Sequence, residues 1–155
     1  MRIASPPIVA LLAAIAIAAV AAAMQDPMAG ERKAVERAVL DYVEGIYEVK
    51  PELIERGVHP RLAKIGYARR AGETYVESEM SYEQLVRLAG AYNAEGRIPA
   101  DAPKTIQVLD VLDQTASAKL TAFWGIDYMH LAKFDGQWKI IQVLWQTSPP
   151  DRGRQ

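Results

Sequence analysis

Residues 116–146 read ASAKLTAFWGIDYMHLAKFDGQWKIIQVLWQ, and this stretch decides the fold of the chain. It contains all three tryptophans and both phenylalanines of the protein. Two apolar runs meet within it at Asp135-Gly136. An Asp-Gly pair between alternating apolar residues is typical of a two-residue hairpin turn, because both turn positions need a positive φ. The stretch therefore predicts two long antiparallel strands joined at that turn.

The residues before this stretch predict helices and further strands. Apolar residues recur every three or four positions from Glu31 to Val49, as in an amphipathic helix that ends before Pro51. A short helix over 51–56 and a third helix, opened by a capping box at Ser81, should follow. Strands are expected over 63–68, 74–80, 104–112 and 117–124, with a turn at 71–72 and a loop over 93–103. Helices grouped against one antiparallel sheet predict an α+β domain.

The first 23 residues predict an export signal. Met1-Arg2 gives a short positive start, and an apolar run from Ile8 ends in the alanines Ala21 to Ala23, which suit a signal peptidase. This run of roughly 16 residues is shorter than the about 20 that span a bilayer. We therefore expect a secreted or periplasmic protein with a cleaved signal peptide at 1–23. The alternative is an uncleaved leader that serves as an N-terminal membrane anchor.

The same interpretation sets the domain boundaries. A lead-in over 24–30 should precede a single domain over 31–147, and the proline-containing residues 148–155 should form a disordered tail. Contact with a membrane is expected only through an uncleaved leader.

Composition excludes several classes of function. The formal net charge of −1 leaves no basic excess for binding nucleic acid. The chain has no cysteine, so it can form neither a disulfide nor a thiolate metal site, and its two histidines lie far apart in sequence. It also lacks a phosphate-binding glycine loop, a dinucleotide fingerprint and a nucleophile elbow. No metal and no cofactor is therefore expected.

The pattern G-x-D-Y-x-H-L-x-K-x-D-G-x-W-K-I at Gly125 to Ile140 resembles the nuclear transport factor 2-like superfamily, as does His59-Pro60 after a short helix. Within it, the chain is most similar to the SnoaL-like branch described as "putative lumazine-binding". The resemblance covers 31–147. It implies a cone-shaped α+β fold in which helices pack on the concave face of a curved antiparallel sheet, with a pocket between the first helix and the sheet. Such proteins include isomerases, dehydratases, cyclases and members without activity, so function must be argued from the pocket.

The hairpin turn predicts which side chains share a face of the sheet. If Phe134 lies opposite Gln137, a regular register divides the side chains into two sets. The first face carries Asp127, Met129, Leu131, Lys133, Trp138, Ile140, Gln142 and Leu144, and the second carries Tyr128, His130, Ala132, Phe134, Gln137, Lys139, Ile141 and Val143, with Trp145 beyond. In the family that the chain resembles, the tryptophan and isoleucine after the turn point into the cone. The first face should therefore line the pocket.

Asp127 and Gln142 are then polar candidates for ligand binding in an apolar pocket. A carboxyl group in such surroundings has a raised pKa and can serve as a general base or a hydrogen-bond donor. Alternatively, Asp127 begins a strand and caps the turn before it. Three aromatic residues, Tyr42, Tyr47 and Trp124, are further ligand-binding candidates, although aromatics at helical spacing also form cores.

His59 would lie at the mouth of the family's cone, where it could act as an acid or base. It could equally be an extended residue before a proline. Asp127 and His59 are the best candidates for catalysis, without a defined reaction.

The second face is too apolar for a sheet surface left in water. Because members of the resembling family commonly dimerise through the convex face, we expect a homodimer there. The expected interface residues are Tyr128, His130, Ile141, Val143 and Trp145. His130 is a structural candidate more than a catalytic one.

Three hypotheses follow. The first is an exported, dimeric domain that binds a small apolar or aromatic molecule. The second is a cofactor-free isomerase or dehydratase, with Asp127 as the base and His59 or Tyr42 as its partner. The third is a structural dimerisation module whose sheet face is its working surface.

Overall fold

The computed structural model describes residues 26–69 and 74–149, and the chain divides between Gly30 and Glu31 into two units. The predicted signal peptide at 1–23, the predicted turn at 71–72 and residues 150–155 of the predicted tail lie outside this description. None of the helices in the described ranges combines the length and apolarity needed to cross a bilayer.

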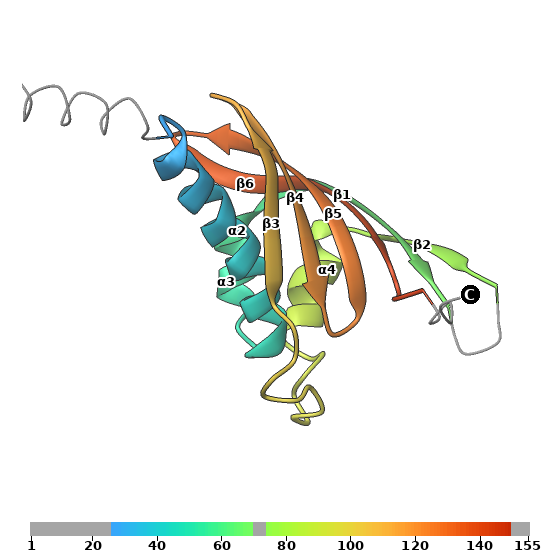
Figure 1. Cartoon of the computed structure of the whole chain (residues 1–155). Helices are drawn as coiled ribbons and strands as arrows, with labels where there is room; N and C mark the ends of the chain where they lie inside the picture. The colour runs from blue at the N-terminus through green and yellow to red at the C-terminus, as the bar shows by residue number, and fades with distance from the viewer. Residues whose placement is uncertain (1–25, 70–73, 150–155) are drawn as a thin grey trace, which may run out of the picture. The chain divides into compact units, whose positions relative to one another are not determined.

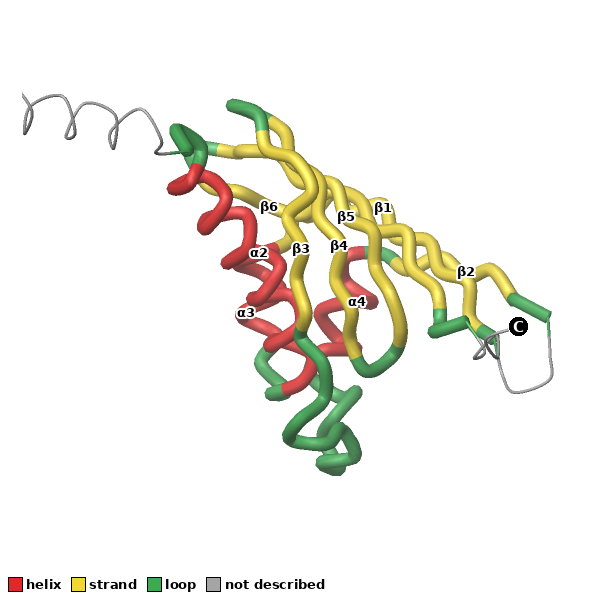
Figure 2. The backbone as a smooth tube through the Cα atoms, in the orientation of Figure 1, coloured by secondary structure: helices red, strands yellow, loops and turns green. Residues whose placement is uncertain are grey.

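Figures 1 and 2 show the helices and strands in the order helix, helix, strand, strand, helix, then four strands. The elements are α2 (Ala29–Tyr47), α3 (Pro51–Gly57), β1 (Val58–Ala68), β2 (Val76–Met80), α4 (Tyr82–Ala89), β3 (Thr105–Val111), β4 (Thr115–Ala122), β5 (Gly125–Phe134) and β6 (Gln137–Gln146). The predicted α+β order is confirmed. The capping box is confirmed too, since the Ser81 side chain accepts from the Gln84 backbone and the Gln84 side chain accepts from the Ser81 backbone.

The six strands form one sheet in the order β2-β1-β6-β5-β4-β3, and α2, α3 and α4 lie on one side of it (Figure 1). All neighbouring strands pair antiparallel except β1 and β6, which are parallel. The predicted antiparallel pairing holds for β3 to β6, but the sheet as a whole is mixed. Parallel neighbours need a long connection, and here the chain between β1 and β6 contains one helix and four strands.

The buried side of α2 faces the sheet. Its stripe of Val35, Val39, Tyr42, Val43 and Ile46 is at most 2% exposed, as the helical spacing predicts. Burying each of these side chains contributes about 1.5–3 kcal/mol before entropy is counted. The helix ends at Tyr47 and thus before Pro51, as predicted, and Val49 beyond it takes a positive φ of 56°.

The hairpin turn has the predicted conformation, but the register farther along the two strands differs from the predicted one. Asp135 and Gly136 both have positive φ, and the pairs from Phe134–Gln137 to Leu131–Ile140 follow the predicted order. A β-bulge then leaves one extra residue in β6, so that His130 pairs with Gln142.

This bulge exchanges the two faces of β6 beyond Ile140, since a shift of one residue turns every later side chain over. Val143, 1% exposed, now faces the helices with Met129, while Leu144 is 47% exposed. The prediction that Gln142 and Leu144 face the pocket is wrong. So is the prediction that Val143 and Trp145 lie on the outer face.

Candidate functional site

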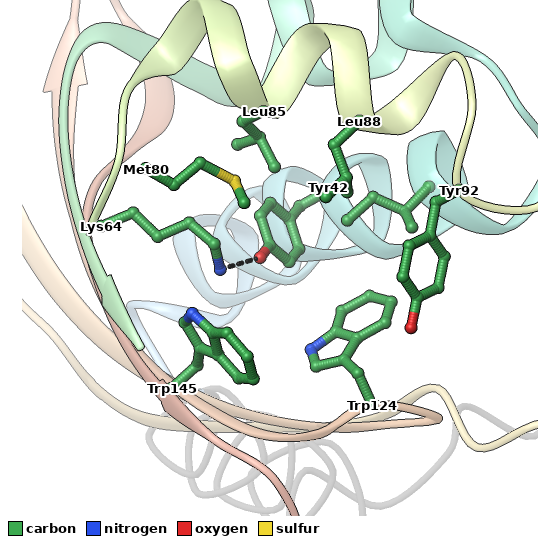
Figure 3. Close-up of a pocket in the computed structure, with 9 residues that line it drawn as sticks. Tyr42, Lys64, Met80, Leu85, Leu88, Tyr92, Trp124 and Trp145 are labelled. Carbon is green, nitrogen blue, oxygen red and sulfur yellow. Dashed lines mark hydrogen bonds between the residues drawn. The ribbon is translucent and has the colours of Figure 1, made fainter. Parts of the chain in front are cut away.

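A cavity of about 90 Å³ lies between α2, α4 and the helix-facing side of the sheet (Figure 3). Most of its lining is aromatic or aliphatic, and one charged side chain reaches it. The lining residues are Tyr42, Ile46, Lys64, Met80, Leu85, Leu88, Tyr92, Trp124 and Trp145. Tyr92 follows α4 and is 42% exposed, so it lies where the cavity meets the solvent.

Lys64, Tyr42 and Asp127 form a hydrogen-bonded cluster beside this cavity. The Lys64 ammonium group donates to the Tyr42 hydroxyl at 2.7 Å and lies 3.5 Å from Asp127 Oδ1. The Tyr42 hydroxyl in turn donates to Asp127 Oδ1 at 3.4 Å, and Trp124 Nε1 donates to Asp127 Oδ2 at 2.6 Å. The Tyr42 hydroxyl therefore links the amine to the carboxylate, and the carboxylate has partners on both oxygens.

Burial controls the charge states of this cluster. Asp127 is 0% exposed and Lys64 6%. Loss of water raises the pKa of Asp127, although its hydrogen bonds and Lys64 act in the opposite direction. Loss of water also lowers the pKa of Lys64 against the attraction of Asp127, and it raises the pKa of Tyr42 well above its ordinary value. Each direction favours an uncharged form. Moving a proton from Lys64 to Asp127 therefore costs less here than in water.

Lys64 also presents a donor to the cavity. An ammonium group has three N–H donors, and the protein accepts from Lys64 at the Tyr42 hydroxyl and, at a long distance, at Asp127. The Trp145 ring lies 5.3 Å from Nζ, and in Figure 3 its indole nitrogen is on the same side of the cavity. Within the described part of the chain, this indole N–H has no hydrogen-bond partner.

Gly66 makes room for Trp145. The two residues are partners across the parallel β1 and β6 strands, and a Cβ atom on Gly66 would lie 2.0 Å from the Trp145 ring. No side chain can begin there while the ring keeps its position. A glycine two residues after Lys64 is thus part of what gives this wall of the cavity its shape.

Three tyrosines hold Trp124 in place. Tyr42, Tyr47 and Tyr92 contact its ring edge-on, with centroid distances of 6.1, 5.6 and 6.0 Å. Such contacts contribute about 0.5–1.5 kcal/mol each beyond the area they bury. Trp124 is therefore fixed both through its rings and through its hydrogen bond to Asp127.

Tyr47 supports the site from outside the cavity. Its hydroxyl donates to the Pro103 carbonyl at 2.8 Å and accepts from the Phe123 backbone N–H at 2.7 Å. These bonds tie the end of α2 to the turn that carries Trp124. The Tyr47 hydroxyl thus does not point into the cavity, which the sequence had left open.

His59 lies away from Asp127. Its ring stacks on Phe134 at 4.0 Å, and its Nδ1 accepts from the Arg61 backbone. Val58, next to it, pairs with Ile140, whereas Asp127 pairs with Trp145. Five residues along a strand span roughly 16 Å, so the structure does not bring His59 and Asp127 together. Partial burial, with Arg61 and Lys139 nearby, lowers the pKa of His59.

The outer face carries Tyr128 and His130, as the register predicted, but Val143 and Trp145 lie on the helix-facing side. Gln142 joins them there, and its side-chain oxygen lies 2.7 Å from His130 Nδ1. Gln142 therefore does not line the cavity. Ile141, at the bulge, is half-buried.

Sequence reasoning missed Lys64, Tyr92 and Trp145 as cavity residues. Lys64 alternates with apolar neighbours, which is typical of a solvent-facing strand residue. The signal against that interpretation was the small size of the next residues on the same face, Gly66 and Ala68. Small residues beside a strand lysine indicate that something large covers that face.

No group of three or more carboxylate, histidine or cysteine side chains able to hold a metal ion occurs in the ranges 26–69 and 74–149. The cluster beside the cavity contains one carboxylate and one amine, and these already contact each other. Its donors suit a hydrogen-bond acceptor better than a cation.

Comparison with known proteins places the chain in a family. The model of the family described as "Putative lumazine-binding" matches residues 30–146. The chain belongs to that family. Among curated proteins, none matches this family member.

Several solved structures share its fold. An NTF2-like protein of unknown function from Shewanella baltica is 14% identical with a TM-score of 0.60, and the match covers 81% of this chain and 100% of that one. An NTF-2-like protein of unknown function from Silicibacter pomeroyi is 15% identical with a TM-score of 0.58, over 77% and 97%. A protein described as a "Putative Scytalone Dehydratase" from Novosphingobium aromaticivorans is 19% identical with a TM-score of 0.51, over 81% and 89%. At these identities the likeness shows the nuclear transport factor 2-like fold alone.

Proposed function

We propose that this family member binds a small organic molecule through a hydrogen-bond-accepting group, with its apolar part in the cavity beside Lys64. The observation that carries this proposal is the Lys64 ammonium group, which is buried and faces an otherwise apolar cavity. A buried charge is costly unless its donors find acceptors. A ligand carboxylate or carbonyl oxygen between Lys64 and the indole N–H of Trp145 would supply one.

The same geometry disfavours a cationic ligand. Aromatic rings around a cavity can hold a quaternary ammonium group. Here Lys64 already occupies that position, since its Nζ lies 5.3 Å from the ring centres of both Tyr42 and Trp145. A second cation would be repelled by the first.

The volume limits the size of the enclosed part. At about 90 Å³, the cavity is smaller than the ~150 Å³ cavity that encloses a benzene ring. A short branched chain fits inside. A bicyclic molecule such as a lumazine would have to leave part of its ring system outside, past Tyr92.

Thermal unfolding with a graded set of acids tests the proposal. Propionate and isobutyrate should raise the melting temperature of the purified protein, and benzoate should do so less. The double variant Lys64→Met/Asp127→Asn removes the cation without leaving a lone buried carboxylate, and it should lose the effect. Lys50→Met changes a half-exposed lysine and should keep it. No shift with any acid, or equal shifts in both variants, would contradict the proposal.

Direct proton transfer by Asp127 is less well supported than binding. The carboxylate is fully buried and lies behind Tyr42, Lys64 and Trp124. An isomerase or dehydratase base needs contact with its substrate at about 2.6–3.2 Å or through one water. The group that a ligand can reach is Lys64.

We also propose that the chain is exported through its apolar N-terminal segment. Expression of the full chain in a bacterium, followed by mass measurement of the periplasmic fraction, tests this. A product that begins after Ala23 supports export. Full-length protein in the membrane fraction would support the anchor instead.

A homodimer through the outer sheet face remains part of the proposal, with corrected residues. Tyr128 and Leu144 are direct neighbours across β5 and β6 and are 49% and 47% exposed. Leu144→Asp should convert a dimer into a monomer, as measured by analytical ultracentrifugation, while propionate still binds. Gln137→Asp, at the exposed end of the hairpin, is the control. A monomeric wild-type protein would contradict the proposed homodimer. If Leu144→Asp became monomeric and also lost propionate binding, the result would favour a purely structural module.

A further inference from the structure

We propose that Lys64 acts as a nucleophile that forms an imine with a small aldehyde or ketone held in the cavity. This inference rests on the proposed binding function and goes beyond it, because it assigns a covalent step to the amine. It depends on three features: where the amine lies, which groups can exchange its proton, and what surrounds it.

The amine lies at the boundary between a polar cluster and an apolar space. On one side, Lys64 Nζ has the Tyr42 hydroxyl at 2.7 Å and Asp127 Oδ1 at 3.5 Å. On the other side, it faces the cavity lined by Leu85, Leu88 and Trp145 (Figure 3). A carbonyl compound in the cavity therefore has its carbon close to the nitrogen.

Only the neutral amine has the lone pair that attacks a carbonyl group. Tyr42 offers a path for the proton, because its hydroxyl accepts from Lys64 and donates to Asp127. Burial supports the transfer, since it lowers the pKa of Lys64 and raises the pKa of Asp127. The ion pair can thus become a neutral amine and a neutral carboxylic acid without any change in total charge.

The chemistry balances with these groups. The Nζ lone pair forms a bond to the carbonyl carbon, and the carbonyl π electrons move to the oxygen, which takes the proton of the Asp127 carboxylic acid through Tyr42. Nζ then returns one proton to this carboxylate, which leaves a neutral carbinolamine. The carbinolamine hydroxyl takes that proton from Asp127 through Tyr42 and leaves as water, while the Nζ lone pair forms the C=N bond. Nζ gives its last proton to the carboxylate, so the imine and the carboxylic acid remain. One carbonyl compound and one amine yield one imine and one water, and no oxidant or reductant is consumed.

The apolar surroundings of Lys64 favour the imine over the free amine. The imine replaces an amine that is costly to keep charged in an apolar site. The water that is released can leave past Tyr92, which is 42% exposed. Aromatic and aliphatic walls reduce the water that could reverse the step.

Reductive trapping tests this proposal. The purified protein is incubated with propanal and cyanoborohydride at neutral pH, and peptide mapping by mass spectrometry locates the propyl groups. We expect Lys64 to be labelled before an exposed lysine such as Lys50, because the hydrogen bond to Glu48 raises the pKa of Lys50 and keeps its amine protonated. Labelling should saturate with propanal and be slowed by propionate, which competes for the cavity.

Two variants distinguish a nucleophile from a merely accessible lysine. Lys64→Arg keeps a positive charge but removes the nucleophilic amine, so it should lose the label. Tyr42→Phe removes the hydroxyl that relays the proton and should slow labelling by about 10²-fold, the usual contribution of a positioned acid or base.

The outcomes separate the two proposals. If propionate binds but Lys64 is labelled no faster than Lys50, the imine is overturned and the binding function stands. If propionate fails to bind and Lys64 is not labelled, both fall. Selective labelling of Lys64 without propionate binding supports the imine and overturns the preference for an anion.

Discussion

The Lys64 ammonium group and the Asp127 carboxylate lie 3.5 Å apart, with side chains that are 5% and 0% exposed. They come from β1 and β5, which are separated in the sheet by β6. Tyr42 of α2 joins them through its hydroxyl. One helix and two strands thus meet at a single buried ion pair beside the cavity.

Breaking this pair should destabilise the fold. Removing one partner of a buried pair leaves an uncompensated charge and typically costs about 3–5 kcal/mol. We expect Lys64→Met and Asp127→Asn each to lower the free energy of unfolding in urea by an amount in that range.

The double variant Lys64→Met/Asp127→Asn should be closer to the wild type than either single variant. The asparagine oxygen can still accept from Trp124, and no lone charge remains. Additive losses in the double variant would show that the two side chains do not act as a pair.

The bulge in β6 predicts unequal losses of stability at two neighbouring residues. Val143→Ala removes two buried methyl groups and should cost about 2–3 kcal/mol. Leu144→Ala changes a half-exposed side chain and should stay within about 0.5 kcal/mol. Urea unfolding of the two variants measures both losses of stability. A larger loss for Leu144→Ala than for Val143→Ala would indicate a regular register without the bulge.

Gly66 should not tolerate a methyl group. Gly66→Ala places Cβ against the Trp145 ring, so the ring must move, and overpacking of this kind costs about 1–3 kcal/mol. Tryptophan fluorescence should report the change, and propionate binding should weaken. Gly90→Ala is the matched control, because Gly90 has an ordinary φ of −72° and its nearest contact at Cβ is 3.6 Å. Equal stability of both variants would argue against the close contact.

The buried pair also predicts a pH dependence. The pKa of Asp127 is raised, so its contribution to stability is full below about pH 3.9, the ordinary value, and is lost as pH rises through its folded value. The pKa of Lys64 is lowered, so its contribution is smallest where it is charged and grows as pH rises through its folded value.

Relative to the Lys64→Met/Asp127→Asn variant, the wild type should therefore be least stable near neutral pH and gain at both ends. Urea unfolding of the two proteins at a series of pH values gives this difference, in which groups outside the pair cancel. A difference that is largest near neutral pH would mean that the attraction within the pair outweighs its burial.

Local patterns in the sequence predicted most of the fold. Asp135-Gly136, the Ser81 capping box and the stripe of α2 each act over a few residues, and each is found as predicted. The sequence also predicted that Asp127 lies on the helix-facing side. This prediction holds because the bulge adds a residue to β6 and leaves the alternation of β5 unchanged.

The features that the sequence did not predict depend on long-range contacts. The extra residue at Ile141 leaves no clear mark in the alternation of a strand that is apolar on both faces, so the pocket and outer sets were exchanged beyond it. Lys64 enters the site because β1 joins β6 in parallel, a pairing that no local pattern specifies. The ion pair could thus be found only once the sheet order was known.

The most direct test of the account uses the indole N–H signals of the three tryptophans in an NMR titration with propionate. Trp124 Nε1 donates to Asp127, Trp138 Nε1 donates to Glu31, and Trp145 Nε1 faces the Lys64 side of the cavity. We predict a saturable shift of the Trp145 signal, a smaller shift of Trp124 and none of Trp138. The shifts should disappear in Lys64→Met/Asp127→Asn. If Trp145 does not respond, or if all three signals move alike, the cavity beside Lys64 is not the binding site.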